Sequence, residues 1–129
     1  MKRPRILPRP TEGELELLRI LWERGPSTVR ELHDDISTRR PLGYTSVLKL
    51  LQIMADKGLV EREESARAHI YRPAASQNET QNQLLRDISE RLFAGSAAQL
   101  AMHALSLDAV NDHDLDTLRT LIDQKRNRQ

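Results

Sequence analysis

Four capping boxes divide this sequence into helices. In a capping box, a Ser or Thr side chain accepts a hydrogen bond from the backbone N–H three residues later, and a Glu or Gln at that later position bonds back. The four matches are Thr11 with Glu14, Thr28 with Glu31, Ser76 with Glu79, and Ser96 with Gln99. Four helix starts in a chain of 129 residues predict a mainly helical protein.

The first two boxes predict helices over about Glu12–Arg24 and Val29–Ser37, the first of which ends at Gly25-Pro26. A third helix is expected from about Tyr44 to Lys57, with Gly58 as its stop. The apolar residues of each helix recur at helical spacing, which places them on one face. The expected inward residues are Leu15, Leu18, Leu21, Trp22, Leu32, Ile36, Val47, Leu50, Leu51 and Met54.

Two short strands are expected after the third helix. Leu59–Glu64 and Ala68–Arg72 flank the turn Ser65-Ala66-Arg67, and Pro73 closes the unit. Three helices followed by a two-stranded ribbon is the order of a winged helix-turn-helix. We therefore expect a mainly α fold with a small β-ribbon, in which residues 11–75 form a winged-helix DNA-binding domain.

Three further helices are predicted in residues 76–129, over about Gln77–Phe93, over Ala97–Leu107, and after a cap at Asn111 or Asp112. Short helices that follow a complete small domain have little to pack against. Their exposed apolar surface predicts a partner, most simply a second copy of the chain. The residues expected in this helical dimerisation region are Leu84, Leu85, Ile88, Leu92, Phe93, Leu100, Leu105, Leu115, Leu118, Leu121 and Ile122.

The formal net charge of +1 conceals an uneven distribution. Residues 1–10 carry +4, residues 11–38 carry −4, residues 39–72 carry +3 and residues 73–129 carry −2. The first ten residues also hold three prolines, which predict a basic, flexible arm. The positive block at 39–72 covers the third helix and the ribbon, and such an asymmetry favours a polyanionic partner.

Several classes of chemistry are not expected. There is no cysteine, so thiolate metal sites and disulfides are excluded, and a reducing cytoplasm is the simplest compartment. The glycines are isolated, the four histidines lack metal-ligand spacing, and no hydrolase motif occurs. No apolar run approaches the roughly 20 residues of a membrane span. We expect no enzyme, no cofactor, no metal and no membrane insertion.

The outer face of the third helix carries the candidate nucleic-acid contacts. Thr45, Leu48, Lys49 and Gln52 follow helical spacing, and polar side chains of these types can bond base edges or phosphates. Two interpretations of Leu48 are open: packing against the preceding turn or the wing, or contact with a thymine methyl group. The helix start also offers free N–H groups to a phosphate. The expected DNA-binding residues are Arg39, Arg40, Tyr44, Thr45, Ser46, Leu48, Lys49, Gln52, Arg67 and Tyr71.

Three segments of the chain resemble a known family. They are TEGELELLRILWERGPSTVRELHDDI, GYTSVLKLLQIMADKGLVEREE and HIYRP, and they are similar to the penicillinase-repressor family of the BlaI/MecI/CopY type. The resemblance implies a homodimeric transcriptional repressor whose N-terminal winged helix binds a palindromic, double-stranded operator. It also implies that Thr45, Ser46 and Leu48 face DNA bases, with Tyr44 and Lys49 beside them and Arg67 in the wing.

The resemblance also bears on the inducing signal. The copper-responsive branch senses metal through a C-terminal cysteine cluster, which this chain lacks. In the β-lactam-responsive branch, a membrane metalloprotease sensor cuts an Asn-Phe bond in the penultimate helix, and His103-Ala104 stands at that place here. Relief by proteolysis is therefore the first expectation. The alternatives are release by direct binding of a small ligand, or a winged helix that serves as a protein-interaction adaptor.

Overall fold

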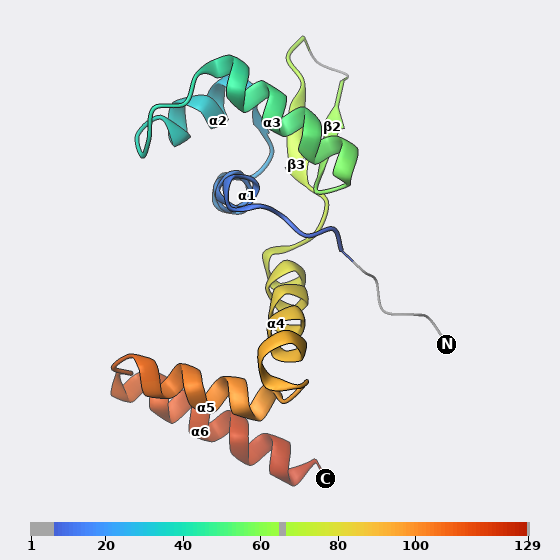
Figure 1. Cartoon of the computed structure of the whole chain (residues 1–129). Coiled ribbons are helices and arrows are strands. Elements are labelled where there is room, and N and C mark those ends of the chain that lie inside the picture. Colours follow the sequence, from blue (N-terminus) through green and yellow to red (C-terminus); the bar gives the residue numbers. More distant parts are fainter. Residues whose placement is uncertain (1–6, 65–66, 129) are drawn as a thin grey trace. The chain divides into compact units, whose positions relative to one another are not determined.

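The computed structural model describes residues 7–64 and 67–128. This part of the chain forms six helices and one three-stranded antiparallel sheet (Figure 1). In chain order the elements are α1 (Glu12–Arg24), β1 (Ser27–Thr28), α2 (Val29–Ile36), α3 (Tyr44–Lys57), β2 (Val60–Glu63), β3 (Ile70–Pro73), α4 (Gln77–Phe93), α5 (Ala97–Leu107) and α6 (Asp112–Asn127). The predicted winged-helix order is confirmed. Residues 1–6 of the expected arm and Ser65-Ala66 of the ribbon turn lie outside the described residues.

The capping boxes begin the helices that they predict. Thr11 and Thr28 each accept from the backbone N–H three residues on, and Glu14 and Glu31 bond back. Ser76 and Glu79 make the same reciprocal pair before α4. Ser96 accepts from the Gln99 N–H before α5, and Asn111, one of the two expected caps, begins α6. Local side-chain chemistry thus sets five of the six described helix starts.

The winged-helix core lies where α1, α2, α3 and β3 meet. The predicted inward residues of α2 and α3 are buried, except that Leu50 is only half-buried. On α1 the prediction is partly wrong, because Leu17 and Ile20 are fully buried while Leu15 and Trp22 are half-buried. Helix α1 contacts α2, α3 and β3, so its buried arc is wider than a single apolar stripe. The buried core is Leu17, Leu18, Ile20, Leu21, Val29, Leu32, Ile36, Val47, Leu51, Met54, Leu59, Val60 and Tyr71.

The sheet has one strand more than the predicted ribbon. Strand β1 pairs with β3, giving the order β1-β3-β2, with Ser27 opposite Tyr71 and Thr28 opposite Ile70. Two residues between two helices are too few to show the alternation that identifies a strand in sequence. Because β3 is the central strand, Tyr71 is enclosed on both sides, whereas the edge strand β2 is mostly exposed.

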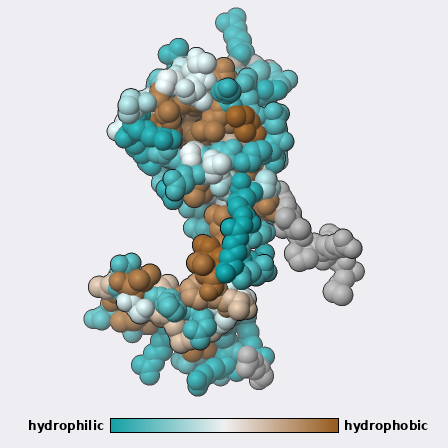
Figure 2. All heavy atoms as spheres, viewed as in Figure 1, coloured by the Kyte–Doolittle hydropathy of each residue, from teal (hydrophilic) through white to brown (hydrophobic). Residues whose placement is uncertain are grey.

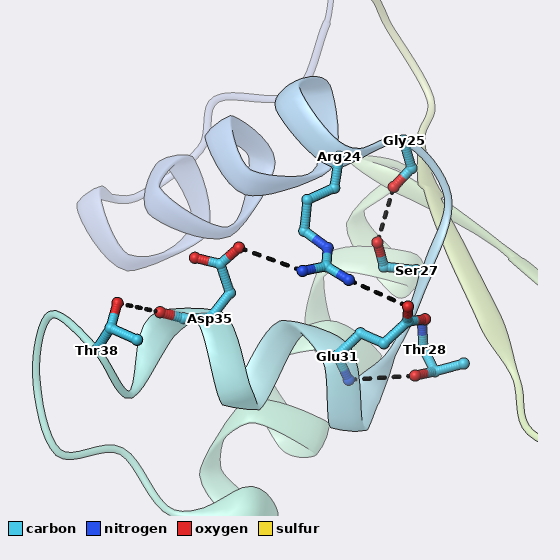
Figure 3. A network of polar contacts seen from close by, with 7 residues as sticks. All are labelled: Arg24, Gly25, Ser27, Thr28, Glu31, Asp35 and Thr38. Atoms are coloured by element: carbon cyan, nitrogen blue, oxygen red, sulfur yellow. Dashed lines mark hydrogen bonds and ion pairs between the residues drawn. The ribbon is translucent and has the colours of Figure 1, made fainter.

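A polar network fixes α2 against the end of α1 (Figure 3). Arg24 Nη2 lies 3.1 Å from Glu31 Oε2, and Arg24 Nη1 lies 3.6 Å from Asp35 Oδ2. The Thr28 backbone N–H and hydroxyl, followed by Arg24, lower the pKa of the Glu31 carboxyl. The Arg24 guanidinium therefore contacts carboxylates in both the first and the last turn of α2.

The chain divides into two compact units, one ending at Leu85 and one beginning at Arg86. Helix α4 contributes to both, and its buried Thr80 belongs to the first unit. In that unit, Trp22 Nε1 donates to the Ala75 carbonyl oxygen at 3.1 Å. The proposed start of the dimerisation region at residue 76 stays a prediction.

In the C-terminal unit, large apolar side chains remain exposed on α4, α5 and α6, and Figure 2 shows apolar surface there. They include Ile88, Leu92, Met102, Leu105, Leu107, Leu115, Leu121 and Ile122. None of the helices between residues 7 and 128 has the length and apolar content needed to cross a membrane.

Candidate nucleic-acid interface

Helix α3 is anchored at its end by an ion pair between the exposed Lys57 and the buried Glu14. Lys57 Nζ lies 2.6 Å from Glu14 Oε1, and it also donates to the Arg9 carbonyl oxygen at 3.3 Å. Burial alone would raise the pKa of the Glu14 carboxyl, but hydrogen bonds from Lys57 and from Thr11 together lower it. The inner face of α3 packs into the core through Val47, so its outer face has a fixed direction.

The outer face of α3 presents polar side chains. Thr45, Ser46, Lys49 and Gln52 are all exposed, as a DNA-reading helix requires. Leu48 is half-buried and packs against the core. It still lines a surface groove, which leaves one side of it open to a ligand.

A basic groove lies where α3, the start of α2 and the wing meet. Its volume is about 440 Å³. The cations that line it are Arg30 and Arg67, and none of its described lining residues is acidic. The complete lining is Thr28, Val29, Arg30, Tyr44, Leu48, Arg67, Ala68 and His69. Of the expected DNA-binding residues, the structure brings Tyr44, Leu48 and Arg67 together here.

Sequence reasoning missed Arg30 and His69. Arg30 lies in the first turn of α2, within the block of residues 11–38 whose net charge is −4. Its exposed side chain reaches the groove because β1 places the start of α2 beside β3. The usable signal was an Arg two residues after the N-cap Thr28, since a helix start and a cation together favour phosphate.

A second groove, of about 620 Å³, has the opposite charge. It is lined by Gln52 and, among others, by Asp56, Glu61 and Glu64, with Arg62 as its one described cation. The structure therefore separates Gln52 from the basic groove and places it beside carboxylates. The first half of α3 therefore borders the basic groove, which suits a polyanion, whereas Gln52 in its second half lies beside carboxylates.

Arg39 and Arg40 lie elsewhere. Arg40 Nη2 bonds Glu16 Oε1 at 2.8 Å. Both arginines line a third groove over α1, together with Arg19, Glu12 and Glu16. The structure does not bring them together with Arg67, because the turn that carries them folds onto α1.

The expected contact of Tyr71 with phosphate is wrong. Tyr71 is fully buried in the central strand of the sheet, so its ring and hydroxyl are closed to DNA. A phenol in an alternating strand can face either side, and this one lies on the face that packs into the helical core.

Comparison with known proteins agrees with this fold. A family model described as penicillinase repressor matches residues 10–124. "Transcriptional regulator BlaI" of Mycobacterium tuberculosis is 35% identical over 111 residues, which cover 83% of this chain and 79% of that protein.

Two solved structures share the winged-helix fold. The solution structure of the DNA binding domain of the repressor BlaI has a TM-score of 0.51, with 19% identity over 61% of this chain and 93% of that one. Bacillus licheniformis BlaI, in monomeric form in complex with the blaP half-operator, has a TM-score of 0.50 with the same identity and coverage. The extent of the family match, together with the M. tuberculosis relative, shows that this chain belongs to the penicillinase repressor family.

Proposed function

We propose that this chain is a transcriptional repressor that binds double-stranded operator DNA through α3 and the β2–β3 wing. The basic groove carries the proposal, because it joins the first half of α3 to two cations on neighbouring elements. In this arrangement Arg30 and Arg67 neutralise phosphates, which supplies affinity for any sequence. Thr45, Ser46 and Lys49 face the base edges, which supplies preference among sequences.

The proposal includes a homodimer. Residues 76–129 would pair two copies through the apolar side chains that α4, α5 and α6 leave exposed. Among the expected dimer residues, Leu85, Ile88, Leu92, Leu105, Leu115, Leu121 and Ile122 are exposed, whereas Leu84, Phe93, Leu100 and Leu118 are half-buried. A two-fold dimer matches a palindromic operator with one winged helix on each half-site.

Release by proteolysis at His103-Ala104 is the proposed signal. Both residues are exposed in α5, and the His103 ring contacts Phe93 at 5.2 Å between ring centroids. A cut here would separate α6 and the last four residues of α5 from the rest of the C-terminal unit. A membrane metalloprotease sensor is the proposed agent. Direct ligand binding remains the alternative, and loss of DNA binding upon addition of an effector without cleavage would favour it.

The first experiment is selection of bound duplexes from random DNA fragments with the full chain. The proposal predicts enrichment of an inverted repeat whose half-sites are spaced by whole helical turns. Failure to enrich any duplex would contradict DNA binding and favour a protein-interaction adaptor. A chain truncated after Leu105 should sediment as a monomer while the full chain sediments as a dimer. A truncated chain that still sediments as a dimer would contradict the assigned pairing region.

A further inference from the structure

The start of α3 is unusual among the helices that the structure describes. Its N-cap is Gly43, which makes no side-chain hydrogen bond to the helix. Every other described helix start is capped by a side chain, from Thr11, Thr28, Ser76, Ser96 or Asn111. A helix start without such a cap keeps its N–H groups free and frays more readily. A contact from a neighbouring element would add to the stability of the first turn of α3.

His33, from the last turn of α2, supplies that contact. Its Nε2 lies 2.8 Å from the carbonyl oxygen of Leu42, the residue directly before Gly43. A carbonyl oxygen only accepts hydrogen bonds, so Nε2 carries the proton. The other ring nitrogen, Nδ1, lies 3.7 Å from Asp34 Oδ1. That separation is longer than a hydrogen bond, so the bond to Leu42 is what holds the ring, which is itself half-buried.

The same ring touches the first residue of α3. The rings of His33 and Tyr44 lie 6.0 Å apart between centroids at 70°, an edge-to-face arrangement. Tyr44 lines the basic groove with Arg30, Leu48 and Arg67. His33 thus contacts the residues on both sides of the N-cap, and through Tyr44 it reaches the proposed DNA interface.

We propose that His33 is the positioning residue for DNA recognition, fixing the start of α3 from α2 in place of a side-chain cap. The expected effect of His33 on DNA binding rests on the proposed function. The expected effect of His33 on the start of α3 can be measured without DNA. The hydrogen bond from His33 to the Leu42 carbonyl oxygen fixes the start of α3 while its first-turn N–H groups stay unoccupied. It also ties α3 to α2, whose own start carries Arg30.

Three variants separate the two contacts of the ring. His33→Gln keeps an N–H donor for Leu42, His33→Phe keeps an aromatic ring without a donor, and His33→Ala removes both. Asp34→Asn is the matched control, because its exposed side chain lies beyond hydrogen-bond distance of the ring and the change leaves the bond from His33 to Leu42 in place. The first readout is hydrogen exchange of the Val47 amide, which donates to the Gly43 carbonyl oxygen at 3.1 Å. The second is affinity for a duplex selected with the wild-type chain and for a random-sequence duplex, alongside the thermal midpoint of each variant.

Positioning predicts about tenfold faster exchange at Val47 in His33→Phe and His33→Ala, with near wild-type exchange in His33→Gln and Asp34→Asn. It also predicts about tenfold weaker binding of the selected duplex in the first two variants, with a smaller change on random DNA. His33→Phe with wild-type exchange and affinity would overturn the inference. If His33→Ala fails to fold, the comparison of His33→Phe, which lacks the donor, with His33→Gln, which keeps it, tests the inference. If the wild-type chain selects no duplex, the proposed function fails, and the exchange data still decide the role of His33 in α3.

Discussion

Lys57 Nζ and Glu14 Oε1 lie 2.6 Å apart and join the last turn of α3 to the first turn of α1. Glu14 is also the residue that completes the capping box with Thr11. One buried carboxylate therefore both begins α1 and fixes the end of the helix proposed to read DNA.

Glu14→Gln should lower the free energy of unfolding at pH 7 by about 1–2 kcal/mol, because the amide keeps the capping contact but leaves Lys57 without its counter-ion. The folded-state pKa of Glu14 is lowered, so its stabilisation is present above the unfolded pKa and is lost as pH falls through the folded value. The difference between variant and wild type should therefore shrink below about pH 4. Urea unfolding at several pH values measures it.

Glu23→Gln is the control for this change, since Glu23 is exposed on the same helix. Its effect should stay within about 0.5 kcal/mol at every pH. A Glu14→Gln variant as stable as wild type at pH 7 would show that the ion pair contributes nothing.

Arg30→Ala and Arg67→Ala should each weaken binding to selected and random duplexes alike and reduce the salt slope by about 1, because each removes one phosphate contact. Arg39→Ala, which alters the groove over α1, should have a smaller effect. Titrations of fluorescent duplexes at several salt concentrations test both statements. A larger loss for Arg39→Ala than for Arg30→Ala would show that DNA docks over α1 instead.

Thr45→Ala should relax sequence preference, because its side chain is exposed on the reading face and away from the core. The expected loss on the selected duplex is about 1–3 kcal/mol, with little change on random DNA. Competition between the two duplexes measures the ratio of the affinity for the selected duplex to the affinity for random DNA. Equal losses on both would assign Thr45 to the phosphates.

Gly43→Asn should weaken binding of the selected duplex by about threefold to tenfold, because an Asn cap would occupy N–H groups proposed to face a phosphate. The backbone at Gly43 is extended and no atom lies within 4 Å of an added Cβ, so the side chain fits. Gly43→Ala, which adds the Cβ without a cap, should bind like wild type. If Gly43→Asn binds DNA as tightly as Gly43→Ala, these N–H groups do not contribute.

The helices were largely predictable from the sequence, and the reason is local. Capping boxes and glycine stops act within a few residues, so α1, α3, α4 and α5 begin and end where the sequence predicts. Strand β1 escaped prediction because it consists of two residues and exists only through pairing with β3. Tyr71 is buried because its face of β3 packs into the helical core, a tertiary contact that the local sequence does not encode.

The candidate interface was predictable only in part. The exposed positions Thr45, Lys49 and Gln52 of α3 followed from helical spacing, whereas Ser46 was expected from the family resemblance. The grouping of the cations did not, because it depends on how separate elements meet. Arg40 pairs with Glu16 on α1, while Arg30 reaches the basic groove from the acidic part of the sequence.

Backbone amide shifts recorded while the full chain is titrated with its selected duplex test the central claim most directly. The account predicts the largest changes at Thr28–Arg30, Tyr44–Lys49 and Arg67–His69, which border the basic groove. It predicts small changes at Asp56 and Glu61 in the acidic groove and at Arg39 and Arg40 over α1. The largest changes at either of these two places, with the basic groove unaffected, would contradict it.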